Sequence, residues 1–207
     1  MANNNIKVVC FYTPNGIYSE MANRLKKSCD ALHIPTDIAQ ANDLGSWVKN
    51  CGYKSEFIRN KLANIEDGES ILWIDSDAVV VTYPSLVMEC SQDFAIHARN
   101  GSKSIRPAGR ETIQLPKKWT LEPKWFESGT IFFRKTPQIV AMVELWCSLT
   151  ADGNKWDQWT LQEAWAEIQP PTLWLPRSYC QINRIHGSKD AVILHDLASV
   201  IQKVSRT

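Results

Sequence analysis

The segment 71–81, with the sequence ILWIDSDAVVV, constrains the fold of this 207-residue chain more than any other segment. Its apolar run is typical of a strand that is buried on both faces, as in a parallel sheet. Asp75 and Asp77 interrupt the run, and carboxylates are costly to bury unless another group compensates their charge. Hard cations such as Mg²⁺ and Mn²⁺ prefer oxygen ligands, and open α/β sheets bind ligands at the carboxyl ends of their strands. The segment therefore predicts a metal site at the end of a central strand.

Apolar patterns before this segment predict alternating strands and helices. Residues 6–12 form an apolar run that ends at a Thr-Pro-Asn-Gly turn, and we expect them to be the first buried strand. Residues 17–32 and 54–66 carry apolar side chains at helical spacing, with a short strand expected at 36–39 between them. The order β-α-β-α-β predicts a parallel sheet with crossover helices.

The second half of the chain is less regular. A polar stretch at 99–124 is too long for a simple connection, and long loops in compact domains are often functional. Thr136 and Pro137 are a typical helix start, with a capping hydroxyl followed by proline at the first position. Beyond the polar stretch we expect strands at 125–134, 172–175 and 191–194 and helices at 137–149 and 157–168. A single domain over residues 1–207 is expected.

Composition limits the classes of protein to consider. The formal net charge is +1, which indicates neither a nucleic-acid binder nor a membrane binder as a whole. The polar N-terminus has no signal-peptide core, and no apolar stretch approaches the roughly 20 residues of a spanning helix. A cytoplasmic protein without a membrane span is expected. The six cysteines are scattered without a Cys-x-x-Cys pair, so reduced thiols are expected rather than a zinc site.

The Asp-x-Asp pair is open to several interpretations when it is taken alone. Two acidic residues at a strand end can simply form a turn. Phosphatases of the haloacid dehalogenase type share an apolar-Asp-x-Asp motif, but on their first strand, whereas about 70 residues precede it here. A sugar-phosphate nucleotidyltransferase usually has a Gly-rich loop after the first strand, for which residues 13–16 are a poor substitute. A non-catalytic nucleotide- or glycan-binding domain is a further alternative.

The order of several motifs favours another family. The chain resembles small nucleotide-sugar glycosyltransferases of the GT-A fold over roughly residues 6–200. The resemblance rests on a lysine before the metal strand, the Asp-x-Asp strand itself, a later Ser-Gly strand, an Asp-Gln pair at a helix start, and a histidine that ends a late strand. In this chain these are Lys54, Asp75 with Asp77, Ser128 with Gly129, Asp157 with Gln158, and His195. The resemblance implies an α/β fold with a mostly parallel, Rossmann-like central sheet flanked by helices.

The resemblance also implies a metal and a donor. Asp75, Asp77 and His195 would bind Mn²⁺ or Mg²⁺, which would hold the diphosphate of a nucleotide sugar, with a UDP-sugar expected as the donor. Nucleobase, ribose, phosphate and sugar would be contacted by residues from several segments, namely Phe11, Tyr12, Thr13, Lys54, Asp75, Ser128 and Gly129.

The stereochemistry of transfer depends on which carboxylate lies beside the acceptor. An inverting enzyme needs a carboxylate base near the acceptor hydroxyl, for which Glu127 and Asp157 are the candidates. A retaining enzyme needs no such base. The resemblance favours retention, and in it Asp157 and Gln158 would lie beside the sugar. Asp157 could instead cap the helix that follows it.

The polar stretch at 99–124 bears on the acceptor. Between His97 and Trp125 there are seven basic residues and two acidic ones. An ordinary solvated loop would account for this excess of basic residues. Alternatively, the basic residues would bind a polyanionic acceptor such as hydroxymethylated DNA. Trp119, Trp125, Trp156 or Trp159 could stack on a base or a sugar. Some bacteriophage enzymes glycosylate such DNA, which would place this protein in the host cytoplasm; a phosphorylated glycan or lipid head group would suit the same charges.

Overall fold

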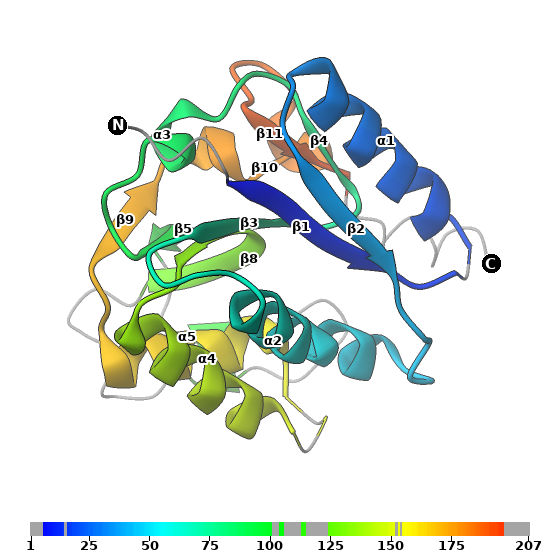
Figure 1. The fold of residues 1–207 in the computed structure, drawn as a ribbon. Helices are drawn as coiled ribbons and strands as arrows, with labels where there is room; N and C mark the ends of the chain where they lie inside the picture. The colour runs from blue at the N-terminus through cyan, green and yellow to red at the C-terminus, as the bar shows by residue number, and fades with distance from the viewer. Residues whose placement is uncertain are drawn as a thin grey trace.

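A six-stranded sheet forms the centre of the fold (Figure 1). The computed structural model describes residues 6–14, 16–100, 104–105, 113–114, 124–151, 153 and 155–196. In spatial order the strands are β2 (Thr36–Gln40), β1 (Lys7–Tyr12), β3 (Ser70–Ile74), β8 (Lys124–Arg134), β5 (Phe94–Asn100) and β9 (Thr172–Leu175). β1 pairs in parallel with β2 and β3, and β5 with β9, whereas β8 is antiparallel to both of its neighbours. The predicted mostly parallel sheet is confirmed.

Helices cover both faces of this sheet (Figure 1). On one face lies α1 (Tyr18–Ala31), beside a small sheet of β10 (Gln181–Ile182), β11 (Ile193–His195) and β4 (Ala78–Val80). On the other face lie α2 (Trp47–Ala63), α4 (Pro137–Thr150) and α5 (Asp157–Ile168). Short elements complete the described chain: α3 (Ser85–Met88), β6 (Ser104–Ile105), β7 (Ile113–Gln114), a 3₁₀ helix (Arg177–Tyr179) and α6 (Asn183–His186).

β3 explains why the core has two halves. Its side chains alternate between the faces, so that Leu72 and Ile74 pack with the α1 side while Ile71 and Trp73 pack with the α2 side. All five residues of the strand are buried, as the apolar run predicted. Burying one large apolar side chain stabilises a fold by about 1.5–3 kcal/mol, so this strand anchors both layers.

The run 71–81 is not one strand, because it breaks at the aspartates. The amide of Ala78 donates to the carbonyl of Asp75 at 3.1 Å, which closes a tight turn. After the turn, β4 leaves the main sheet and pairs antiparallel with β11. The two carboxylates therefore lie in a turn between two sheets, where water and ligands can reach them.

Two other elements differ from the expectation. α2 begins at Trp47 rather than at residue 54, with the Ser46 hydroxyl accepting from the amide of Lys49 at 3.3 Å. Its first turn has no buried residue and lacks the apolar stripe on which the prediction depended. β5 was not expected, because the apolar run that begins at Phe94 is short and polar residues follow it within the same strand. The predicted cap of α4 is confirmed, with Thr136 accepting from Ile139.

Two expectations about the whole chain can be compared with the described residues. None of the helices that the structure describes is long and apolar enough to cross a membrane. All six cysteines lie in the described part of the chain, and each is a free thiol, as expected.

Candidate active site

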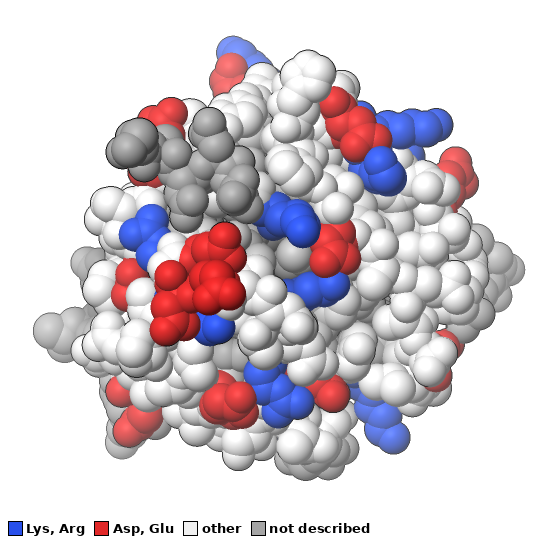
Figure 2. Space-filling view, in the orientation of Figure 1, with Lys and Arg blue, Asp and Glu red and all other residues white. Residues whose placement is uncertain are grey.

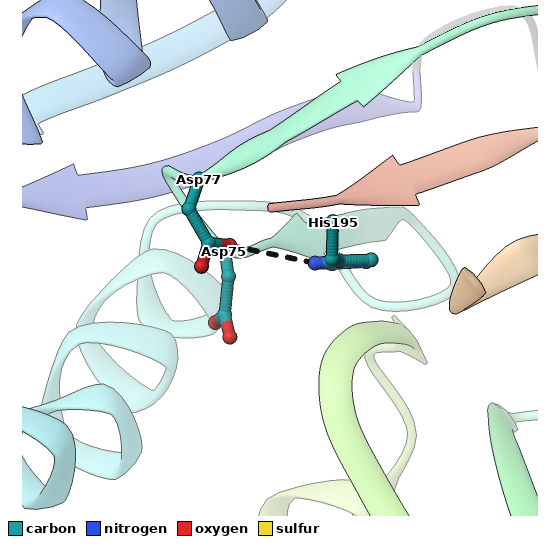
Figure 3. A group of neighbouring side chains, drawn as sticks. All are labelled: Asp75, Asp77 and His195. Carbon is teal, nitrogen blue, oxygen red and sulfur yellow. Dashed lines mark ion pairs between the residues drawn. The ribbon is translucent and has the colours of Figure 1, made fainter. Parts of the chain in front are cut away.

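Asp75, Asp77 and His195 come together at the carboxyl end of β3 (Figure 3). One possible ligand atom of each residue lies within 4.8 Å of the others, and Nδ1 of His195 is 3.5 Å from Oδ1 of Asp77. The pairing of β11 with β4 aligns His195 with Ala78, directly after the aspartate turn. The amide of Asp196 also donates to the carbonyl of Asp77 at 3.1 Å. Residues 118 positions apart in the sequence thus share one site.

The imidazole of His195 is held from its far side. Its Nε2 lies 3.1 Å from the hydroxyl of Thr130, and both residues are buried. Burial alone would lower the pKa of His195, but Cys180 and Asp77 outweigh it and raise the pKa well above its usual value. The contact with Thr130 leaves Nδ1 facing the carboxylates, where a cation would lie.

The chemistry of these three donors fits a hard divalent cation. Carboxylate oxygens suit Mg²⁺ and Mn²⁺, and one imidazole nitrogen is compatible with Mn²⁺. A metal ligand in proteins is usually oriented by a further hydrogen bond, which Thr130 provides for His195. Asp75, Asp77 and His195 are therefore able to hold Mn²⁺ or Mg²⁺.

Lys54 lies beneath this site and connects it to α5. Only 6% of the residue is exposed, and Nζ lies 3.0 Å from Oδ1 of Asp75 and 3.0 Å from Oδ2 of Asp157. It also donates to the carbonyl of Ser128 at 3.1 Å. Burial alone would lower the pKa of Lys54, but Asp157 and Asp75 outweigh it and raise the pKa above its usual value. An ammonium has three protons, so a direct bond to a phosphate would replace one of these contacts.

Asp157 lies in the first turn of α5 and is not the helix cap. The N-cap is Trp156, which makes no side-chain capping bond. Asp157 instead pairs with Lys54 and accepts from the hydroxyl of Ser128 at 3.1 Å. Beside it, Oε1 of Gln158 accepts from the amide of Ser128 at 3.4 Å. The alternative in which Asp157 serves only as a cap is wrong.

A cavity of about 510 Å³ opens above these residues. Its size is within the range of about 300–1,000 Å³ that is usual for small-molecule sites. Most of the predicted site residues line it, namely Phe11, Tyr12, Thr13, Lys54, Asp75, Asp77, Ser128, Asp157 and Gln158. Segments that are far apart in the sequence, from β1 to α5, therefore meet around one space.

Three predicted residues are not in the lining of the cavity. His195 lies 3.5 Å from Asp77 and is one of the three candidate metal ligands. Gly129 lies against His195, and its carbonyl accepts from the amide of Asp75 at 2.8 Å. Glu127 pairs with Arg99 at 3.2 Å, so its carboxylate is already engaged.

Sequence reasoning missed part of the cavity wall. The loop between β2 and α2 contributes Asp43, the first turn of α2 contributes Trp47 and Asn50, and α1 contributes Tyr18. Burial, followed by Cys51 and Asp77, raises the pKa of Tyr18 to about 12, so its phenol keeps its proton at neutral pH. The Gly45-Ser46 pair, a turn residue followed by a capping residue, was the available signal for this loop.

The tryptophans that were expected to stack have different surroundings. Trp156 lines the cavity, whereas Trp125 is buried in the sheet with 4% of its surface exposed. Trp159 is partly buried in α5 and is not in the lining. Trp119 lies outside the described residues.

The basic stretch at 99–124 also lies largely outside the described residues. Of its cations, Arg99 is the one whose side chain is described, and it pairs with Glu127. On the face drawn in Figure 2, positive and negative side chains are interspersed, and no extended basic field is visible among the residues shown in colour.

The chain is similar to known proteins in structure but not detectably in sequence. No protein-family model matches the sequence, and no curated protein matches it. A glycosyltransferase involved in the glycosylation of the major capsid of PBCV-1 matches with a TM-score of 0.67 at 14% identity, over 98% of this chain and 99% of that chain.

Two structures of the galactosyltransferase LgtC also match. The complex with donor and acceptor sugar analogues has a TM-score of 0.54 at 10% identity, over 93% of this chain and 87% of that chain. An active-site mutant of LgtC has a TM-score of 0.53 at 10% identity, over 93% and 88% of the two chains. At these identities the likeness establishes the fold. The chain therefore has the GT-A fold of these glycosyltransferases, as its motifs predicted.

Proposed function

We propose that this protein is a glycosyltransferase, which moves a sugar from a nucleotide-diphosphate sugar to an acceptor hydroxyl and depends on Mn²⁺ or Mg²⁺. The observation that carries the proposal is the meeting of Asp75, Asp77 and His195 in a GT-A fold, with both aspartates lining a cavity of about 510 Å³. The similar solved structures are glycosyltransferases, one of them with donor and acceptor sugar analogues.

The three ligand residues act on the leaving group. In transfer, the bond between the anomeric carbon and the diphosphate oxygen breaks, the acceptor oxygen bonds to that carbon, and the proton of the acceptor hydroxyl passes to an oxygen of the departing diphosphate. The departing diphosphate gains negative charge, which a divalent cation held by Asp75, Asp77 and His195 would stabilise. Phe11, Tyr12 and Thr13, at the carboxyl end of β1, would contact the nucleoside of a UDP-sugar.

The pairing of the carboxylates supports retention of configuration. Asp157 already binds Lys54 and Ser128, and Glu127 already binds Arg99. Neither is placed as an unengaged base for the acceptor hydroxyl, which an inverting reaction would need. Gln158 lines the cavity beside Ser128 and would lie next to the donor sugar. A glutamine-to-glutamate change defines the LgtC active-site mutant, and Gln158 is the candidate for a comparable position here.

The remaining predictions concern the setting of the reaction. A single domain over 1–207 and a cytoplasmic location stay predictions. DNA as acceptor depends on the stretch 99–124 alone and also stays a prediction.

Donor binding is the first test of the proposal. Thermal unfolding of the full chain would be followed with a panel of nucleotide sugars, with and without Mn²⁺. A ligand at a hundredfold excess over its dissociation constant stabilises a protein by about 2.7 kcal/mol, so the correct donor would raise the Tm only when Mn²⁺ is present.

Turnover is the second test. We expect Mn²⁺-dependent release of nucleoside diphosphate from the donor, and its loss in Asp77→Asn. Turnover that survives both this substitution and EDTA would show that the proposed chemistry is wrong. Metal-dependent binding without turnover, against any acceptor tried, would favour the non-catalytic binding domain.

A further inference from the structure

Trp47 and Trp156 form an aromatic pair on the wall of the cavity. Trp47 is the first residue of α2, and Trp156 directly precedes α5. Their ring centroids are 5.9 Å apart and the ring planes meet at 79°, which is an edge-to-face arrangement. Both residues line the cavity, yet 44% of Trp47 is exposed. A large aromatic ring left open beside a cavity is a typical binding feature rather than a packing one.

The backbone of the helix that carries Trp47 is well supported. The helix that starts at Trp47 is capped by Ser46, and Gly52 lets α2 approach α4 so closely that an added Cβ would lie 2.9 Å from Thr150. In an edge-to-face pair, the ring that presents its edge keeps both of its faces clear of the partner ring. Both rings line the cavity, so the pair offers it an apolar aromatic surface.

Two polar side chains line the cavity together with this surface, Asp43 from the loop between β2 and α2 and Asn50 from the first turn of α2. The side-chain Nδ2 of Asn50 donates a hydrogen bond of 2.9 Å to Oδ1 of Asp43. The amide oxygen of Asn50 accepts from the amide of Leu44 at 2.8 Å, which fixes the loop against α2. A carboxylate and a carboxamide next to an aromatic face suit a pyranose ring, which presents C–H groups on its face and hydroxyls at its edge.

Charge argues against an anionic ligand at this wall. Among the described residues that line the cavity, Lys54 is the one cation, and it is buried between Asp75 and Asp157. Asp43 adds a negative charge beside the aromatic pair. Among the described lining residues, a phosphate group at this wall would meet the Asp43 carboxylate and no cation other than Lys54.

We infer that Trp47 and Trp156 form a stacking platform for a neutral sugar ring of the acceptor. The inference builds on the proposed function, because Trp156 directly precedes Asp157 and Gln158, which that function places beside the donor sugar. It assigns a carbohydrate acceptor to the described part of the cavity, in preference to nucleic acid.

Saturation-transfer NMR on the full chain tests the platform directly. The probes are methyl α-D-glucopyranoside, methyl β-D-galactopyranoside and methyl α-D-mannopyranoside, with UDP and Mn²⁺ present. We expect at least one glycoside to receive saturation on the C–H groups of one ring face. Trp47→Ala should weaken its binding about tenfold, the effect of losing one stacked ring. Tyr83→Ala is the matched control, because Tyr83 is 51% exposed and does not line the cavity.

A second variant separates stacking from folding. Trp47→Leu keeps apolar bulk at the start of α2 and removes the aromatic face, so it should lose binding as Trp47→Ala does, with a far-UV spectrum like that of the wild type. Wild-type binding in Trp47→Leu would overturn the inference, as would the absence of saturation in all three glycosides. A DNA duplex that binds at low salt and is released by Trp47→Leu would also overturn it.

The same samples distinguish this inference from the proposed function. If a UDP-sugar stabilises the protein in the presence of Mn²⁺ but no glycoside binds in a way that depends on Trp47, the platform inference is wrong and the transferase proposal stands. Glycoside binding that depends on Trp47, without any effect of Mn²⁺ and nucleotide sugar, would support the platform and contradict the transferase proposal.

Discussion

The imidazole of His195 lies directly against the backbone of Gly129. A Cβ added to Gly129 would stand 2.8 Å from Cε1 and 3.1 Å from Nδ1 of His195, and 3.3 Å from the sulfur of Cys180. Cβ atoms essentially never approach another atom more closely than 3.0 Å, so the contact with Cε1 could not be kept. The glycine therefore makes room for the third candidate metal ligand, in addition to any contact with the donor.

Gly129→Ala should weaken metal binding while the chain still folds. β8 lies between β3 and β5, so its backbone has little freedom to move and His195 must shift instead. We expect Mn²⁺ affinity to fall about 10–100-fold, as when other supports of a metal ligand are removed. Electron paramagnetic resonance of free Mn²⁺ measures this without an activity assay. Gly68→Ala is the control, because a Cβ there meets nothing within 4 Å and only the strain of φ +86° is added. Equal affinities in the two variants would contradict the prediction.

The first half of the fold could be predicted because its signals are local. Helical spacing in α1 and the apolar runs of β1 and β3 each depend on neighbouring residues alone. The position of Asp75 and Asp77 at a strand end followed from the same run. The break after Asp75 did not, because an apolar segment such as β4 looks the same whether it continues one strand or begins another.

The site needed information that no local pattern contains. His195 reaches the aspartates through pairs between strands of three residues each, which are too short for a recognisable period. The resemblance to a family, rather than the physics of the segment, singled it out. The ion pairs of Lys54 join α2 to β3 and α5, and the sequence alone could not distinguish Asp157 as a partner from Asp157 as a cap. The aromatic wall at Trp47 was missed because its helix begins without an apolar stripe.

Asp75→Asn and Asp77→Asn should both weaken metal binding but should differ in stability. Oδ1 of Asp75 accepts from the indole of Trp73 at 2.8 Å and pairs with Lys54 at 3.0 Å. Asp75→Asn therefore removes one of the carboxylates that pair with the buried ammonium of Lys54, and should lower the free energy of unfolding by about 1–3 kcal/mol. Oδ1 of Asp77 lies 3.5 Å from Nδ1 of His195, a longer and weaker contact than either of those made by Asp75, so Asp77→Asn should cost less than Asp75→Asn. Urea unfolding without metal gives the two stabilities, and the reverse order would contradict this assignment.

Stability should fall as the pH rises from about 8 to 10. Burial raises the pKa of Cys10 and Cys51 well above the ordinary value, and burial raises the pKa of Cys29 to about 11. An unfolded thiol loses its proton near pH 8.5, so above that pH the folded chain binds more protons than the unfolded chain. The free energy of unfolding then decreases with pH, by at most about 1.4 kcal/mol per pH unit for each such thiol.

Urea unfolding in a reducing buffer at pH 7.5, 8.5 and 9.5 measures this decrease. Cys10→Ala removes one titrating group and should make the decrease with pH shallower, whatever its effect on stability at neutral pH. A free energy of unfolding that stays constant over this range would contradict the prediction.

Lys54→Met should destabilise the fold far more than a matched change at the surface. Removing the ammonium leaves Asp75 and Asp157 near one another without their shared cation, and breaking a buried ion pair in this way costs about 3–5 kcal/mol. Lys61→Met is the control, because Lys61 pairs with Asp37 at 2.7 Å in a more exposed position and should cost less than about 1 kcal/mol. Bound metal would partly compensate Asp75, so Mn²⁺ should stabilise Lys54→Met by more than it stabilises the wild type. Similar losses in the two variants, or no greater effect of Mn²⁺ on Lys54→Met, would show that Lys54 is not the shared counter-charge of the two carboxylates.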